Sequence, residues 1–243
     1  MRKHGLSQEG LKIIACFAML LDHLAASLVL MLYRQNYCKE LYDLYFILRI
    51  VGRIAFPIFC FQLAEGIHYT KNPLKYGLRL GIGAILAEIP FDLLLFGGFT
   101  WEHSSVMVTL LLAFCWARLA MTTEKPALKM LFLLGFGYIA EFLGSDYGGY
   151  GVLMVALFLL TRDMSRRRVI QAVGLAVICW LIGGSIISIG SIRLPIEIFA
   201  LFSLIPIFAY SGKKRTASPW IQWAFYLFYP VHLAVLLLIV TLM

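Results

Sequence analysis

The chain has 243 residues, of which 61% are hydrophobic and only 14% are charged. Soluble domains typically carry about 25% charged residues. Here apolar stretches of about 20 residues recur along the whole sequence, as in proteins whose helices span a bilayer. The composition therefore excludes an ordinary soluble domain. The net charge of +8 does not indicate a nucleic-acid partner, because Lys and Arg in a membrane protein first of all report its topology.

Nine membrane spans are expected in chain order: 11–32, 44–68, 75–97, 104–121, 127–143, 147–161, 168–189, 193–210 and 219–242. The first apolar run is too long for a signal peptide and contains Asp22 and His23, so we expect it to be retained. The connections are short turns, too short for a second domain. We predict one all-α polytopic bundle that forms a single transmembrane domain over residues 1–243.

The basic residues predict how this bundle is oriented. With the N-terminus in the cytoplasm, sixteen of the 21 Lys and Arg residues fall at inner ends or in inner loops. Only Arg34, Lys39 and Arg193 fall in outer loops, and Arg49 and Arg53 lie inside a span. This asymmetry indicates a multi-pass protein of the inner (cytoplasmic) membrane with its C-terminus outside.

Ionisable side chains within the expected spans are the main functional signal, because each costs about 2.5–3.5 kcal/mol on insertion scales. These residues are Asp22, His23, Arg49, Arg53, Glu65, Glu88, Asp92 and His232. At about 1.5 Å of rise per residue, most of them lie about 13–15 Å from the nearer span end. Arg49 and Asp92 are shallower, about 7 Å below the outer face. Polar groups from four helices are thus expected at similar depth.

The spacing of the charges predicts salt bridges between the second and third spans. Arg49 and Arg53 are four residues apart and share a helix face, as do Glu88 and Asp92. Antiparallel neighbours would place Arg53 against Glu88 and Arg49 against Asp92. Such bridges alone would be a purely structural explanation of these charges.

The two intramembrane histidines are not explained by salt bridges. His23 and His232 titrate near neutral pH and are not needed to neutralise a charge. Asp22 and His23 are adjacent, so their side chains point about 100° apart. We expect Asp22 to pair with an arginine or another helix while His23 faces a cavity. Glu65, near the inner end of its span, is expected at a solvated rim or an inner vestibule.

Prolines lie beside three of the charged layers. Pro57, Pro90 and Pro230 each remove a helix hydrogen bond and free the carbonyl four residues earlier. Freed backbone groups are tolerated in a membrane only against protein or a water-filled cavity. The prolines therefore favour a polar cavity over a set of simple kinks.

Four segments, residues 11–23, 49–66, 88–92 and 228–233, resemble the TraX family. The family is named for a conjugation-associated membrane protein that acetylates the N-terminus of pilin, and the resemblance covers nearly the whole chain. More distantly, the family is similar to the acyltransferase-3 superfamily, which uses an intramembrane His and cytoplasmic acyl-CoA. The resemblance implies an acetyltransferase with acetyl-CoA as the acyl donor and a peptide or small molecule as the acceptor.

Acyl transfer requires a base of near-neutral pKa, an electropositive group at the thioester oxygen, and exclusion of water. His23 is the expected base, Arg53 with His232 is expected to polarise the carbonyl, and Asp22 and Glu88 are expected to orient these groups. The expected substrate-binding residues are Arg49, Asp92 and Glu65. The expected partners of the CoA phosphates are Lys71, Lys75 and Arg79, although topology alone explains any one of these cations.

Two other functional classes remain open from the residues alone. Chains of Asp, Glu and His also form the proton relays of ion-coupled transporters, although no internal repeat halves are visible. A structural membrane partner is the third class, and it would not require the histidines. The five cysteines are far apart and no His stands near them at metal-ligand spacing, so we expect no metal site.

Overall fold

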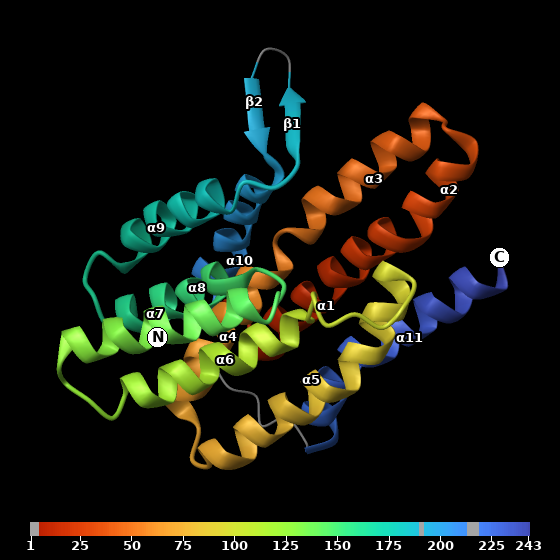
Figure 1. The fold of residues 1–243 in the computed structure, drawn as a ribbon. Coiled ribbons are helices and arrows are strands. Elements are labelled where there is room, and N and C mark those ends of the chain that lie inside the picture. The colour runs from red at the N-terminus through yellow and green to blue at the C-terminus, as the bar shows by residue number, and fades with distance from the viewer. Residues whose placement is uncertain (1–4, 190–191, 213–218) are drawn as a thin grey trace.

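The computed structural model describes residues 5–189, 192–212 and 219–243 (Figure 1). Its described residues form a bundle of helices and one two-stranded hairpin, so the all-α prediction is confirmed. Arg2, Lys3, Lys213, Lys214 and Arg215, which the sequence assigns to the inner side, lie outside the described residues.

The first two expected spans form two long helical segments that run side by side. The first consists of α1 (Gln8–Leu24), the π-helical η1 (Ala25–Val29) and α2 (Leu30–Asn36). The second consists of α3 (Lys39–Gly52) and α4 (Ala55–Tyr69). The interruption at Arg53 and Ile54 follows from Pro57, which has no backbone N–H to donate to the Arg53 carbonyl. The helix is thus interrupted beside Pro57 as expected, whereas the helices Pro73–Phe96 and Pro219–Leu242 continue through Pro90 and Pro230.

Five helices follow in chain order: α5 (Pro73–Phe96), α6 (Val106–Ala120), α7 (Pro126–Phe142), α8 (Gly148–Thr161) and α9 (Arg167–Ile182). Proline occupies the first turn of α5 and of α7, where its missing N–H costs nothing. The last helix, α11 (Pro219–Leu242), packs along α5, whereas α3 packs against α1 and η1. This helix packing determines which charged side chains lie in contact.

The chain after α9 differs from the expected spans 168–189 and 193–210. Helix α9 ends at Ile182, before Gly183 and Gly184, which both have positive φ. An antiparallel hairpin of β1 (Ile186–Ile189) and β2 (Ile192–Pro195) follows, then the 3-10 helix η2 (Ile196–Ser203) and the short α10 (Leu204–Phe208). The paired glycines end the helix, and the β-branched isoleucines favour strands. The expectation of two continuous helices here was wrong.

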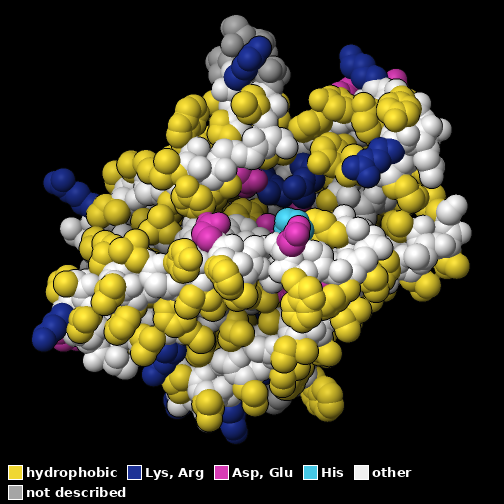
Figure 2. Space-filling model, in the orientation of Figure 1, with side chains coloured by type: hydrophobic (Ala, Val, Ile, Leu, Met, Phe, Trp, Pro, Cys, Tyr) yellow, Lys and Arg dark blue, Asp and Glu magenta, His cyan; other side chains and the backbone are white. Residues whose placement is uncertain are grey.

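Within the part of the chain that the structure describes, three helical segments are long and apolar enough to cross a membrane: Gln8–Asn36, Lys39–Tyr69 and Trp223–Leu242. Large apolar side chains also cover much of the protein surface seen in Figure 2. The chain is therefore a membrane protein, while nine spans and their orientation stay predictions. Two backbone contacts fit the predicted alternation, because Leu6 bonds Ala209 and Ser104 bonds Gly144, each joining ends assigned to the same side.

Candidate functional site

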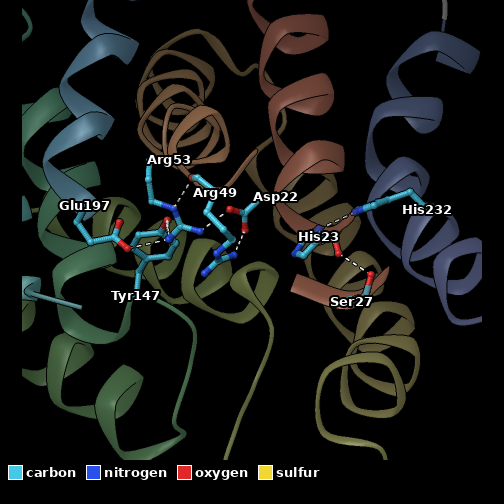
Figure 3. A network of polar contacts seen from close by, with 8 residues as sticks. All are labelled: Asp22, His23, Ser27, Arg49, Arg53, Tyr147, Glu197 and His232. Carbon is cyan, nitrogen blue, oxygen red and sulfur yellow. Dashed lines mark hydrogen bonds and ion pairs between the residues drawn. The ribbon is translucent and has the colours of Figure 1, made fainter. Parts of the chain in front are cut away.

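Asp22 of α1 holds both intramembrane arginines of the second segment. Its Oδ2 accepts a bond from Arg49 Nη1 and its Oδ1 accepts one from Arg53 Nη2, each at 2.5 Å (Figure 3). The predicted pairing of Asp22 with an arginine is confirmed. Gly52 makes this approach possible, because a Cβ atom at that position would lie 2.2 Å from Asp22 Oδ1. The helices can be this close only where one of them has no side chain.

Arg53 is the centre of a buried polar network. Besides Asp22, its Nη1 donates to Glu197 Oε1 at 2.7 Å and to the Tyr147 hydroxyl at 3.2 Å, and its Nε donates to the Arg49 carbonyl at 3.2 Å. Arg53 and Glu197 are each only 6% exposed. Because every nitrogen of this guanidinium has a protein partner, Arg53 fixes α1, α3 and η2 relative to one another.

The expected pairs Arg53–Glu88 and Arg49–Asp92 are wrong. Glu88 Oε1 instead accepts bonds from the Ser105 amide at 3.0 Å and from the Ser105 hydroxyl at 2.5 Å. The reason is that α5 packs along α11 and α6, while α3 packs against α1. The second and third spans are consecutive in the chain, but they do not bring their charged faces together.

Glu88 and Asp92 stabilise the connection between α5 and α6. Ser105 is the N-cap residue of α6 and makes no side-chain cap of its own, so the Glu88 carboxylate lies where the helix dipole favours an anion. Asp92 is 1% exposed and its Oδ2 accepts a bond from the Thr100 amide at 3.2 Å. This burial does not favour direct contact between Asp92 and a substrate.

The two histidines form a directed hydrogen-bonded pair. His23 Nδ1 lies 2.8 Å from His232 Nε2 (Figure 3). His232 Nδ1 lies 2.7 Å from the carbonyl oxygen of Phe228. A carbonyl can only accept, so His232 Nδ1 carries the proton. In the neutral ring, His232 Nε2 then accepts from the Nδ1–H of His23. This fixes the His23 tautomer and leaves its Nε2 with a free lone pair.

The backbone around His23 departs from a regular α-helix. The π-helical turn η1 begins two residues after His23, and such turns often occur at functional sites. The Ser27 hydroxyl donates to the His23 carbonyl at 2.6 Å (Figure 3). The irregular turn and its side-chain bond hold His23 at a fixed height beside α11.

A small cavity of about 30 Å³ adjoins the histidine and the carboxylates, and its lining includes Asp22, His23, Asp146, Tyr147 and Phe59. The backbone of Asp146 is anchored by its amide, which donates to the Ser104 carbonyl at 2.9 Å. Its side chain is exposed and makes no hydrogen bond or ion pair with any residue that the structure describes. An unpaired carboxylate therefore shares this cavity with the imidazole of His23.

A second cavity, of about 430 Å³, opens at the end of the bundle assigned to the cytoplasm. Its lining includes Lys12, Lys71 and Arg79, and the guanidinium of Arg79 lies 5.5 Å from the ring centre of Tyr226. Phe59 lines both this cavity and the small one. The two cavities therefore adjoin at the ring of Phe59.

The cavity linings sort the remaining predicted residues. Lys71 and Arg79 line the large cavity, whereas Lys75 does not, and the binding of CoA phosphates by these residues stays a prediction. Glu65 forms an ion pair with Arg162 at 2.8 Å and lines a third cavity at the same end, while its expected role in substrate binding stays a prediction.

Four residues of the site were missed by the sequence analysis: Lys12, Asp146, Tyr147 and Glu197. Glu197 could have been predicted as a site residue, because it is a charged residue within the expected span 193–210. Asp146 and Tyr147 lie in a polar turn, where nothing in the pattern indicates that they approach a buried histidine.

The sequence is similar to known proteins over nearly its whole length. The model of the TraX protein family matches residues 7–240. The chain is 30% identical over 246 residues to the "Probable fimbrial assembly protein FimC, serogroup H1" of Dichelobacter nodosus, covering 97% of this chain and 96% of that protein. No solved structure matches the chain.

Proposed function

Because the chain belongs to the TraX family, we propose that it is a membrane-embedded acetyltransferase of the inner membrane. The donor is cytoplasmic acetyl-CoA, and the acceptor is an amino group, of a peptide N-terminus or a small molecule, reached from the outer side. The relative is named for fimbrial assembly, which makes a fimbrial subunit one acceptor to test.

The observation that carries this proposal is the bond between His23 and His232, which leaves His23 Nε2 as a proton acceptor beside a cavity. The acceptor amine attacks the thioester carbonyl as Nε2 removes its proton, so a C–N bond forms. The C–S bond then breaks, and the thiolate takes the proton from His23 to leave as the CoA thiol. His232 orients His23 by accepting its Nδ1–H at Nε2, and the same bond stabilises the protonated form of His23.

The role of Arg53 follows from its full set of partners. Since its nitrogens are bonded to Asp22, Glu197, Tyr147 and the Arg49 carbonyl, we assign Arg53 as a positioning residue. Arg49 is more exposed than Arg53, with 24% of its side chain accessible, and only its Nη1 bonds to described residues. Arg49 is therefore the better candidate for polarising the thioester oxygen.

The donor is assigned to the large cavity. Its volume of about 430 Å³ is in the range of ligand pockets, and Lys12, Lys71 and Arg79 match the diphosphate of CoA in charge. From this cavity the acetyl thioester would reach His23 past Phe59, which borders both spaces.

Asp146 supports an amine rather than a hydroxyl as acceptor. An unpaired carboxylate in the same cavity as His23 attracts an ammonium group and accepts its first proton, so that the neutral amine attacks while His23 removes the second proton. A hydroxyl acceptor would gain only a hydrogen bond from this residue.

The proposal is tested with purified protein in detergent and in proteoliposomes. Radiolabelled acetyl-CoA is supplied with an amine-terminated peptide, and with the same peptide blocked at its N-terminus as the control. We expect release of CoA thiol and label transfer to the free amine only. Folded protein that consumes no thioester with any acceptor, yet moves protons in the proteoliposomes, would overturn the proposal in favour of a transporter.

A further inference from the structure

A third cavity, of about 400 Å³, lies where α4 and α8 end and α9 begins. It is separate from the cavity assigned to the donor, with which it shares only Tyr69 among its lining residues. The positive-inside pattern assigns this end of the bundle to the cytoplasmic face.

The cavity has an excess of positive charge. Arg162, Arg167 and Arg168 line it, against the single carboxylate of Glu65, which already accepts a bond from Arg162 Nε at 2.8 Å. The positive-inside pattern alone explains why basic residues occur here, but it does not require their side chains to line one cavity. Arg166, in the same loop, is exposed and does not line the cavity.

The three arginines differ in how firmly they are held. Arg162 forms ion pairs with Glu65 and, at 3.1 Å, with the exposed Asp163, and it donates to the Tyr69 hydroxyl at 2.7 Å. Arg167 Nη1 donates to the Arg162 carbonyl at 3.2 Å. The guanidinium of Arg168 lies 5.6 Å from the ring centre of Phe208 and forms no hydrogen bond or ion pair with the described residues. Its donors are available to a ligand.

Two further features indicate the chemistry of that ligand. Helix α9 begins at Arg167 with no acidic residue in its first turn, so the positive end of its dipole adds to the arginine charges. Phe61, Phe158 and Phe208 form an apolar part of the wall. Arginines match phosphate oxygens in geometry, and basic pockets between membrane helices are suited to charged head groups.

We propose that this cavity is a binding site for a phosphate group carried on a larger molecule. Two sources present this chemistry at the inner face: the head group of an anionic phospholipid and the 3′-phosphate of CoA. The site does not depend on acetyl transfer, because phosphate binding is measured without turnover.

The test compares Arg168→Gln with Arg166→Gln, a matched control that removes the same charge from the same loop outside the cavity. Binding of short-chain phosphatidylglycerol is measured against phosphatidylcholine, and binding of CoA against 3′-dephospho-CoA, with the unfolding temperature of each variant as a check on folding. We expect Arg168→Gln to lower the preference for one phosphate-bearing ligand about tenfold, as for the loss of a charge-assisted hydrogen bond. The control should keep the wild-type preference.

Loss of the phosphatidylglycerol preference identifies a lipid site, and loss of the 3′-phosphate preference identifies a CoA subsite. Loss of both supports a general phosphate site. If the wild-type protein shows neither preference, or if both preferences survive in folded Arg168→Gln protein, the proposal is overturned. Absence of acetyl transfer would refute the proposed function but would leave the lipid measurement intact.

Discussion

Replacing Arg53 by Met should destabilise the protein chiefly through Glu197. Asp22 would keep Arg49 as a partner, but Glu197 would lose its only ion pair among the described residues, and its Oε2 already has no hydrogen-bond partner. Glu197 is 6% exposed, so the substitution leaves a buried carboxylate uncompensated. Breaking a buried pair in this way costs about 3–5 kcal/mol in free energy of unfolding.

The second substitution distinguishes the observed network from the salt bridges expected from spacing. Arg53→Met combined with Glu197→Gln should recover about 2 kcal/mol or more, because neither buried charge then remains. Arg53→Met combined with Glu88→Gln is the matched control and should recover nothing. The assay is unfolding of purified protein in mixed detergent micelles. Equal rescue by both second substitutions, or a stable Arg53→Met single variant, would refute this reasoning.

Three other predictions use separate parts of the structure. Gly52→Ala should lower the free energy of unfolding by about 1–3 kcal/mol, because the added Cβ forces Asp22 aside. The control Gly81→Ala has nothing within 4 Å of its added Cβ and should be neutral or stabilising. Equal stability of the two variants would contradict the close approach of Gly52 and Asp22. Lys12→Gln should raise KM for acetyl-CoA several-fold, because it removes a phosphate partner from the large cavity. Lys75→Gln, which lies outside that cavity, should leave KM unchanged. The opposite order would exclude the large cavity as the donor site. Cysteine labelling should find the 162–168 loop accessible from the cytoplasm and the 144–149 loop from outside, and labelling of both from one side would remove a span.

The sequence predicted the components of the site better than their contacts. The cost of placing charges in lipid singled out eight residues, and the structure brings five of them into two adjacent bonded groups: Asp22, His23, Arg49, Arg53 and His232. The other three, Glu65, Glu88 and Asp92, have partners elsewhere. The pairing failed because helix spacing defines faces but does not say which helices are neighbours.

Irregular backbone was predictable only where a residue forces it. Pro57 indicated the freed Arg53 carbonyl, and the chain is interrupted there. Gly183 and Gly184, followed by isoleucines, indicate that α9 ends there, but the high hydropathy of the whole stretch led to the prediction of a continuous span. The position of Asp146 depends on long-range packing of its turn, so no local pattern could reveal it.

The central claim, that His23 is the general base, is tested most directly by acetyl transfer in His23→Gln. Glutamine keeps a donor for His232 Nε2 but has no basic nitrogen, so unfolding temperature and CoA binding should match the wild type. Transfer should fall by about 10²–10⁴-fold, the usual contribution of a general base. His232→Gln should cost less, because that residue acts only through His23. Near-normal transfer by well-folded His23→Gln protein would contradict the account.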